Sequence, residues 1–264
     1  MTLTDFLDTL AIESIERADK GYYNVETHVN KKPVNLVKAI KNCKHIPIVA
    51  EIKQRSPSLG SIRNEIDPVA ISYAFKNGGA VGISVITEPN RFEGSLQLLR
   101  KVRETVDLPI LMKDFVTRKV HVEAASRLGA DALLLINELF ERGYCIQPLH
   151  DMIDLVHSRG LEVLLETHNA EEFQRALDTD ADIVGINNRD LRDLSVNLET
   201  AHRILKKYTP HGKIVIVESG IRDRNDLNCF LKLGADAFLI GSSLMKTKDI
   251  ENKLKEFTTT NEHC

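Results

Sequence analysis

Two opposite charges lie two residues apart where an apolar segment of this sequence ends. The segment Ile46–Ala50 runs directly into Glu51 and Lys53. Alternate side chains of a β-strand point to the same side, so both charges are expected on the face of Val49, the inward face of a buried strand. An ionised group there is costly unless it is paired or used in chemistry. This spacing therefore predicts a functional site.

Other apolar runs also end in a side chain suited to proton transfer or hydrogen bonding, and these side chains are Lys113, Glu166, Asn187 and Glu218. If the runs are strands of one barrel, their carboxyl ends meet at one rim. Amines and acids held close together shift one another's pKa values enough for proton transfer near neutral pH. One charged residue at a strand end is usually just the first solvated position, but two lysines and three glutamates together predict an acid–base site.

Small residues follow the last two apolar runs and predict a phosphate site. Ser219 and Gly220 follow one run, and Gly241 and Ser242 follow the next. Such residues let backbone N–H groups approach an anion, and a helix that begins there adds its dipole. They are also common in turns, but their presence after two consecutive strands favours phosphate binding. Ser56 is expected to supply a third contact.

Short apolar runs alternate with amphipathic charged stretches along the chain, in the rhythm of repeated βα units. The expected strands are 47–53, 81–87, 109–113, 132–136, 162–166, 183–187, 214–218 and 237–241. This number of parallel strands closes a barrel. We therefore predict an α/β fold, a (β/α)8 TIM barrel with an extra N-terminal helical segment.

An internal repeat supports the barrel. Arg127–Leu135 (RLGADALLL) resembles Lys232–Ile240 (KLGADAFLI), and weaker copies lie at Gly79–Ile83 and Asp180–Val184. In each copy a helix would end at a residue that tolerates the left-handed conformation, and a buried strand would begin at once. All four copies precede even-numbered strands, as expected of duplicated βα pairs.

Residues 1–264 are expected to form a single barrel domain, in which residues 1–45 are a helical extension packed on the barrel. Apolar residues near helical spacing support this, namely Leu3, Phe6, Leu7, Leu10 and Ile15. Thr2 and Asp5 resemble a capping box, and Gly21 can end the helix. Whether the helix only stabilises the barrel or also encloses a substrate stays open.

The composition limits the possible partners. The 264-residue chain is 42% hydrophobic and 28% charged, as is typical of a globular protein with a sizeable core. Its formal net charge of -3 argues against nucleic acid as a partner. A basic leader and an apolar stretch of membrane-spanning length are both missing, so we expect a cytoplasmic protein that does not bind membranes.

Motifs for metals and cofactors are also missing, and neither is expected. The cysteines form no C-x-x-C pair, which argues against a zinc ribbon or a redox motif. His168 follows Glu166 by two residues, but no H-E-x-x-H, EF-hand or G-x-G-x-x-G pattern is present. His121, His157 and His202 are predicted to be solvated helix residues.

The motifs at the expected strand ends resemble those of the indole-3-glycerol-phosphate synthase family, barrel enzymes of tryptophan biosynthesis. The resemblance runs from Pro47 to Met245, and its strongest carrier is EIKQRSPSLGSI at 51–62. Further matches are GISVITEP (82–89), PILMKDF (109–115), LLETH (164–168), GINNRDL (185–191), VESGI (217–221) and LIGSSL (239–244). Many relatives carry two aromatic residues where this chain has Arg91 and Phe92.

The resemblance implies a lyase that acts on a phosphorylated small molecule without a cofactor. Its reaction is ring closure, decarboxylation and dehydration of 1-(2-carboxyphenylamino)-1-deoxyribulose 5-phosphate to indole-3-glycerol phosphate. We expect a monomer or a weak homodimer.

By resemblance, Lys113 would protonate the ketose carbonyl oxygen as the ring carbon attacks. Lys53 would bind the substrate carboxylate and later protonate the departing hydroxyl, with Glu51 as the base in dehydration. Glu166 would assist proton transfer and orient Lys113. How these roles divide between the two lysines and between the two glutamates stays open.

Asn187 would hold a sugar hydroxyl or the carboxylate, and Glu218 would bind nearby polar groups. The ring wall and rim would comprise Phe92, Phe115, Leu133, Arg189 and Leu191. Each of the apolar residues could instead be ordinary packing, and Arg189 could instead pair with an acidic residue at the rim.

Two other functions stay open. A Schiff-base aldolase or a sugar-phosphate isomerase could use the same lysines on the same phosphate-binding barrel. A binding protein without catalytic activity is the other alternative, although buried lysines and glutamates without a function would only reduce its stability.

Overall fold

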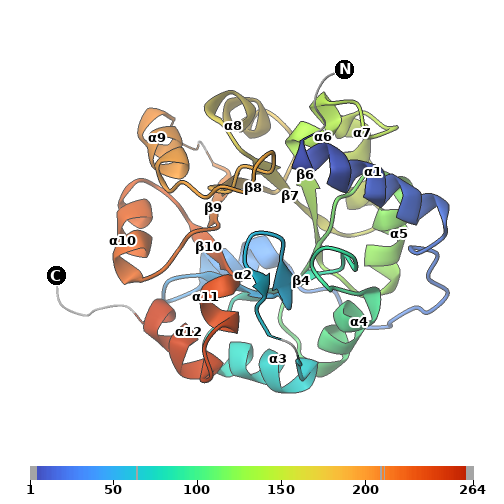
Figure 1. Cartoon of the computed structure of the whole chain (residues 1–264). Coiled ribbons are helices and arrows are strands. Elements are labelled where there is room, and N and C mark those ends of the chain that lie inside the picture. Colours follow the sequence, from blue (N-terminus) through green and yellow to red (C-terminus); the bar gives the residue numbers. More distant parts are fainter. Residues whose placement is uncertain (1–4, 64, 209, 211, 260–264) are drawn as a thin grey trace.

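Parallel strands close into a barrel in the computed structural model, which describes residues 5–63, 65–208, 210 and 212–259 (Figure 1). Around the barrel the strands are β1 (Ile48–Ile52), β4 (Gly82–Ile86), β5 (Ile110–Lys113), β6 (Ala132–Ile136), β7 (Glu162–Thr167), β8 (Ile183–Asn187), β9 (Ile214–Glu218) and β10 (Ala237–Ile240). β1 pairs with both β4 and β10, which completes the ring. The predicted (β/α)8 fold is confirmed, and each predicted strand is present with its ends displaced by no more than a residue.

The outer layer consists of helices that bury their apolar faces on the strands. They are α3 (Pro68–Asn77), α4 (Leu96–Thr105), α5 (Lys119–Arg127), α7 (Leu149–Ser158), α8 (Ala170–Leu177), α9 (Glu199–Lys207), α10 (Arg224–Lys232) and α12 (Ile250–Thr258). Additional elements are α1 (Phe6–Asp19), α2 (Leu36–Asn42), α6 (Asn137–Glu141), α11 (Ser242–Met245) and the hairpin of β2 (Arg55–Ser56) and β3 (Gly60–Ser61). Among the helices of the described residues, none has the length and apolar character needed to span a membrane.

The repeated segment has a structural role at the amino ends of the strands. Asp131, Asp182 and Asp236 each accept a backbone N–H near the start of the preceding strand, β5, β7 and β9 respectively, at 2.8 Å. These carboxylates tie each strand pair together at the end of the barrel opposite the strand carboxyl ends. The glycines before three of the repeated strands adopt the predicted left-handed conformation, whereas Asp180 in the fourth copy does not.

Helix α1 packs against the barrel, where it lies beside α5 and α6 (Figure 1). Asp5 caps it, and the side chains of Asp5 and Asp8 form a reciprocal capping box. Its Leu7 and Leu10 belong to the same apolar cluster as Phe115 beyond β5. The helix ends two residues before Gly21, as the sequence predicts, while Thr2 and Leu3 lie outside the described residues.

His121 on α5 is a buried residue, and the prediction that it is solvated is wrong. Its side chain is 0% exposed, and its Nε2 lies 3.1 Å from the Ser14 hydroxyl of α1. The ring also packs on Tyr23 at a centroid distance of 3.9 Å. The position lies on an outer helix of the barrel, but the N-terminal extension covers it.

We predict that Asp131→Ala strongly destabilises the fold. Asp131 is almost fully buried, and it also accepts from the equally buried Arg103 guanidinium at 2.7 Å. Its loss leaves a buried charge without its partner, which costs about 3–5 kcal/mol of unfolding free energy in urea titrations. Asp182→Ala is the matched control, because this more exposed carboxylate occupies the equivalent position and should cost only about 1 kcal/mol. An equal loss in both variants would contradict this interpretation.

We also predict that His121 weakens the fold as the pH falls. Burial lowers the pKa of His121 to about 3 in the folded protein, whereas an unfolded histidine titrates near 6.5. The unfolded chain therefore binds more protons below pH 6.5, and from pH 7 to pH 5 this group removes about 2 kcal/mol of unfolding free energy. Urea titrations should show a smaller decline for His121→Gln than for the wild type, and equal declines would show that His121 is not responsible.

Candidate active site

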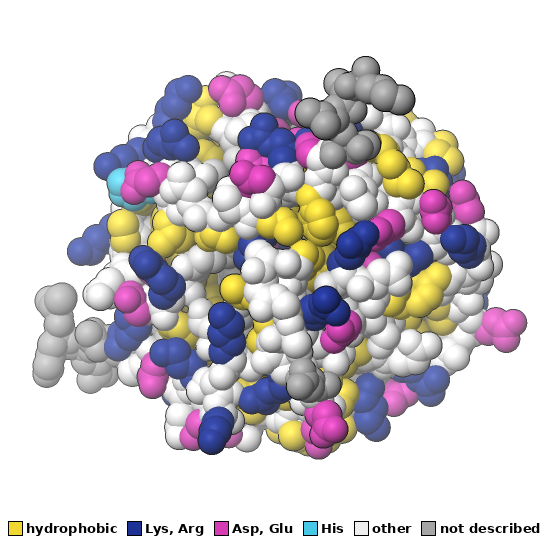
Figure 2. Space-filling view, viewed as in Figure 1, with side chains coloured by type: hydrophobic (Ala, Val, Ile, Leu, Met, Phe, Trp, Pro, Cys, Tyr) yellow, Lys and Arg dark blue, Asp and Glu magenta, His cyan; other side chains and the backbone are white. Residues whose placement is uncertain are grey.

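A cavity of about 580 Å³ opens at the carboxyl ends of the barrel strands. Its walls combine side chains at the strand ends with residues of the following loops, including Leu59 of the hairpin and Val196 after β8. Figure 2 shows this face of the molecule, where hydrophobic side chains are exposed near the middle and charged side chains surround them. A cavity of this volume is of the size that small-molecule sites have.

The two lysines and three glutamates singled out in the sequence all line this cavity. The Lys113 Nζ lies 2.8 Å from Glu166 Oε2 and 3.3 Å from Glu218 Oε2. The Lys53 Nζ lies 2.6 Å from Glu51 Oε1. The structure thus brings together charges from β5, β7, β9 and the end of β1.

Strand register explains why these charges point inward. Val49 on β1, Leu111 on β5 and Leu164 on β7 belong to the apolar cluster inside the barrel. Glu51, Lys113 and Glu166 each follow one of these residues by two positions, so they point to the same side. The inward-facing side chains of these three strands therefore change from apolar to charged as each strand reaches the cavity.

Two glycines provide the space that buried carboxylates need. A Cβ at Gly185 would lie 2.5 Å from Glu218 Oε1, and a Cβ at Gly241 would lie 2.6 Å from Glu51 Oε1. Any larger residue would displace a carboxylate oxygen, because real atoms do not approach so closely. The carboxylates therefore lie directly against the backbone of the neighbouring strands.

The charged groups of this cluster shift one another's pKa values in opposite directions. Burial alone would lower the pKa of Lys113, but Glu166, Glu218 and Glu51 outweigh it and raise that pKa above its ordinary value. Burial acts to raise the pKa of Glu166, yet Lys113 and His168 hold it below the usual range. Burial and the charges of Glu166 and Glu51 raise the pKa of Glu218 to about 8 despite Lys113. The site thus combines an ammonium group and a carboxyl group with raised pKa values and a carboxylate with a lowered pKa.

Four of the five predicted phosphate contacts line one end of the cavity, and they are Ser219, Gly220, Gly241 and Ser242. Ser219 and Gly220 have consecutive positive φ angles of 63° and 85°, which turn the backbone sharply after β9. The Ser243 hydroxyl donates to the Ile221 carbonyl at 2.6 Å and joins the two loops.

Ser56 is the exception, and its contact with phosphate stays a prediction. It lies in the β2–β3 hairpin, where it pairs with Gly60, and its buried hydroxyl lies 3.1 Å from that of Ser58. It does not line the cavity formed by the described residues. The hairpin begins only three residues after β1, and a sequence reading that treats this segment as a simple loop misses it.

Three of the four predicted apolar ring contacts, Phe92, Phe115 and Leu191, line the cavity. The rings of Phe92 and Phe115 lie 6.0 Å apart between centroids. Leu133 is the fourth, and its predicted position is wrong, because it packs in the outer cluster between the strands and the helices. Its neighbour Leu134 faces the cavity instead. Counting back by twos from the strand end at Ile136 would have identified Leu134.

Arg189 and Asn187 complete the rim. The Arg189 guanidinium donates to the Ser58 hydroxyl at 2.9 Å and to the Leu194 carbonyl at 2.7 Å. Within residues 5–63, 65–208, 210 and 212–259, no ion pair joins it to a carboxylate, so the alternative of a rim ion pair is not observed. Asn187 is buried and accepts the Arg189 backbone N–H at 2.9 Å.

The sequence analysis assigned no role at the site to three polar residues in or beside the cavity, namely Glu88, Asp114 and His168. Glu88 and Asp114 line the cavity, and both are buried. His168 lies outside the cavity lining, but its Nε2 is 3.2 Å from Glu166 Oε1. Its spacing of two from Glu166 was the available signal, since residues two apart on a strand share a face.

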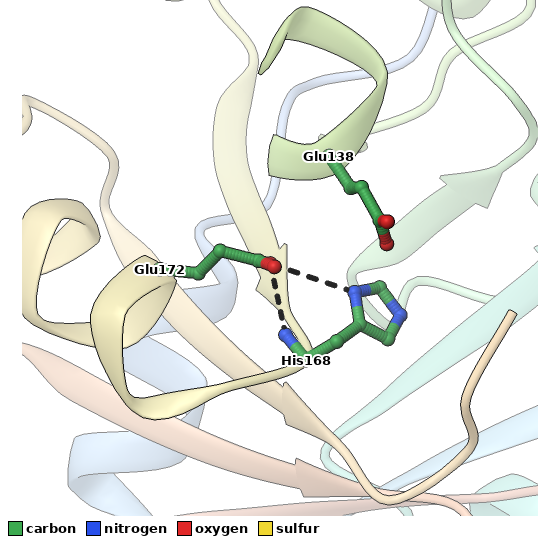
Figure 3. A group of neighbouring side chains, drawn as sticks. All are labelled: Glu138, His168 and Glu172. Atoms are coloured by element: carbon green, nitrogen blue, oxygen red, sulfur yellow. Dashed lines mark hydrogen bonds and ion pairs between the residues drawn. The ribbon is translucent and has the colours of Figure 1, made fainter. Parts of the chain in front are cut away.

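Glu138, His168 and Glu172 offer the geometry of a metal site among the described residues, with candidate ligand atoms within 4.8 Å of one another (Figure 3). Both carboxylates are already in use. Glu138 pairs with Arg142 at 2.5 Å, and Glu172 accepts the His168 backbone N–H at 3.0 Å. The two carboxylates of this cluster therefore already have protein partners.

Comparisons with known proteins find similar sequences that cover most of the chain. A family model described as "Indole-3-glycerol phosphate synthase" matches residues 10–257. A protein of that name from Methanocaldococcus jannaschii is 43% identical over 231 residues, which cover 86% of this chain and 84% of the relative. Another from Acetivibrio thermocellus is 38% identical over 226 residues, covering 86% and 85%.

Solved structures with the same fold are more distant. Thiamine phosphate pyrophosphorylase from Pyrococcus furiosus has a TM-score of 0.59 at 17% identity, with 84% of this chain and 96% of that chain covered. N-acetylmannosamine-6-phosphate 2-epimerase from Clostridium perfringens has a TM-score of 0.58 at 16% identity, with 81% and 93% covered. Both show similarity of fold alone. The matching family model and curated relatives extend over nearly the whole barrel, and the chain belongs to the indole-3-glycerol phosphate synthase family.

Proposed function

We propose that this protein catalyses the family reaction, in which 1-(2-carboxyphenylamino)-1-deoxyribulose 5-phosphate closes its pyrrole ring and loses carbon dioxide and water. The observation that carries this proposal is the Lys113 ammonium group, held between two buried carboxylates in a partly apolar cavity. A charged acid in such a place is suited to protonating a carbonyl oxygen as carbon attacks it.

The residues that line the cavity support this choice of substrate. Its phosphate would lie at the loops after β9 and β10, against Ser219, Gly220 and Ser242. Its aromatic ring would lie against Phe92 and Phe115 at the opposite wall. The ketose carbon between them would then lie near Lys113.

Ring closure would begin when the ring carbon attacks the ketose carbonyl carbon. Lys113 would give its proton to the carbonyl oxygen, where negative charge develops. Glu166, ionised beside it, would hold the ammonium group in place and assist the return of a proton. Release of carbon dioxide then restores the electrons to the ring.

Dehydration would use the ion pair of Lys53 and Glu51. Lys53 would bind the substrate carboxylate and afterwards protonate the departing hydroxyl, while Glu51 at 2.6 Å from it would take up the proton that leaves the substrate. Asn187 would hold a sugar hydroxyl or the carboxylate, and Glu218 would bind polar groups nearby. Arg189 would lie at the rim over the bound molecule.

We further propose a cytoplasmic protein that works as a monomer or a weak homodimer and requires no cofactor. Residues 1–45 would be an extension of a single barrel domain, and the apolar cluster that Leu7 and Leu10 share with Phe115 supports this assignment.

The direct test is to add the purified protein to the proposed substrate and follow the fluorescence of the indole product without added metal or nucleotide. Lys113→Ala should lower kcat roughly 10²- to 10⁴-fold, as expected for loss of a general acid, and should leave product affinity largely unchanged. Wild-type turnover in the variant would refute the role of Lys113. Borohydride should trap no substrate adduct, and a trapped adduct would favour the aldolase alternative.

We predict that Gly185→Ala impairs turnover while the protein stays folded. The added methyl group would meet Glu218 Oε1 at 2.5 Å, and the displaced carboxyl group would lower kcat about 100-fold, as an error of about 1 Å in a catalytic group does. Gly82→Ala is the matched control, since its methyl group would crowd Leu36 at 2.9 Å, away from the cavity. Steady-state kinetics should show near-normal kcat for Gly82→Ala, and equal losses would contradict the explanation.

A further inference from the structure

The two oxygens of Glu166 face different cations. Oε2 lies 2.8 Å from the Lys113 Nζ, and Oε1 lies 3.2 Å from His168 Nε2. The Glu166 side chain is 1% exposed and that of His168 is 8% exposed, so water hardly reaches either group. A carboxylate with a separate partner at each oxygen is restricted in its rotation. A carboxylate with a single partner rotates more freely.

His168 is itself held from the far side of its ring. Its Nδ1 lies 3.6 Å from Glu172 Oε2, and its backbone N–H donates to the same oxygen at 3.0 Å. Glu172 is in the first turn of α8, where Asn169 caps the helix. Figure 3 shows Glu172 and Glu138 reaching His168 from two different helices. The charges that face the ring on this side thus come from elements that do not line the cavity.

We propose that His168 is a positioning residue, which holds the Glu166 carboxylate in the orientation that Lys113 requires; this inference rests on the proposed function. The line of contacts runs from Glu172 through the imidazole to Glu166 and then to the ammonium group. His168 does not line the cavity, so it acts on the reaction only through Glu166.

The surroundings keep the imidazole positively charged. Acidic groups face it from every neighbouring element, namely Glu166 on β7, Glu172 on α8, Glu138 on α6 and Asp190 after β8. Arg142 and Arg192 partly neutralise Glu138 and Asp190. Burial alone would lower the pKa of His168, but Glu166 and Glu172 raise it to about 10. At neutral pH, Glu166 therefore lies between two cations.

The test compares His168→Gln, Glu172→Gln and a control, His157→Gln, with the wild type. Gln at position 168 keeps a hydrogen-bond donor but removes the charge. Gln at position 172 keeps the helix cap, since Gln serves at this position as well as Glu. His157 forms the same type of pair, with Asp182 at 2.8 Å, but it lies on α7 and outside the cavity lining.

We expect His168→Gln to lower kcat roughly 10- to 100-fold, as loss of an outer-shell partner does, with little change in KM. Removing the cation raises the pKa of Glu166, so the acid limb of the kcat profile should move about 1 to 2 pH units higher. Glu172→Gln should lower kcat less than His168→Gln does, because it removes one contact of the ring but leaves the imidazole charged at acid pH. Neither Glu172→Gln nor His157→Gln should move the limb to higher pH. The ionisations of the substrate are common to all four proteins, so differences between profiles report the protein alone.

An acid limb that stays at the wild-type pH in His168→Gln would overturn the proposal, as would a loss of thermal stability with unchanged kcat. If His168→Gln fails to fold by circular dichroism, Glu172→Gln decides by its kcat, and a wild-type kcat would overturn the proposal. A wild-type protein without turnover would instead refute the proposed function. In that case, NMR titration of the His168 ring still tests the contact, since its midpoint should lie near 10 and fall in Glu172→Gln, and an ordinary midpoint near 6.5 would overturn it.

Discussion

The balance of charge among buried groups is the constraint on which this barrel mouth depends. Glu51, Glu166 and Glu218 are each about 1% exposed, so their charges must be compensated by nearby cations or removed by protonation. Lys53 compensates the first, while Lys113 lies between the other two. Burial and the charges of Glu166 and Glu51 raise the pKa of Glu218 to about 8 despite Lys113. The same charges raise the pKa of Lys113, while Lys113 and His168 lower the pKa of Glu166.

This constraint extends into the strands around the site. Carboxylates at the ends of β1 and β9 fit only because glycines stand at Gly241 and Gly185 beside them. The amino ends of the strands follow a different rule, in which buried aspartates such as Asp131 tie the strand pairs together. The barrel therefore separates stability from chemistry, as is general for this fold. Charges at one end hold the strands, and charges at the other end are arranged for proton transfer.

The sequence predicts the strands and the inward charges well, because both follow from the alternation of side chains. It fails where a contact depends on elements distant in the chain. His121 has the pattern of a solvated helix residue, and only the packing of α1 buries it. Ser56 lies in a hairpin that forms immediately after β1, and the sequence does not predict this hairpin. Leu133 is different, since the alternation that located Glu166 would also have assigned it to the outer face.

The contacts that the N-terminal extension makes with the barrel also hold residues of the cavity wall in place. Arg17 on α1 is buried and lies 3.0 Å from Glu88 Oε1 and 3.8 Å from Asp114 Oδ1. Glu88 in turn accepts the backbone N–H of Phe92 at 2.9 Å, which places that ring in the cavity wall. Asp114 directly follows Lys113 in the chain. Since a buried arginine requires acidic partners, the contacts that hold α1 on the barrel also fix the loop that carries Phe92 and the end of β5 that carries Lys113.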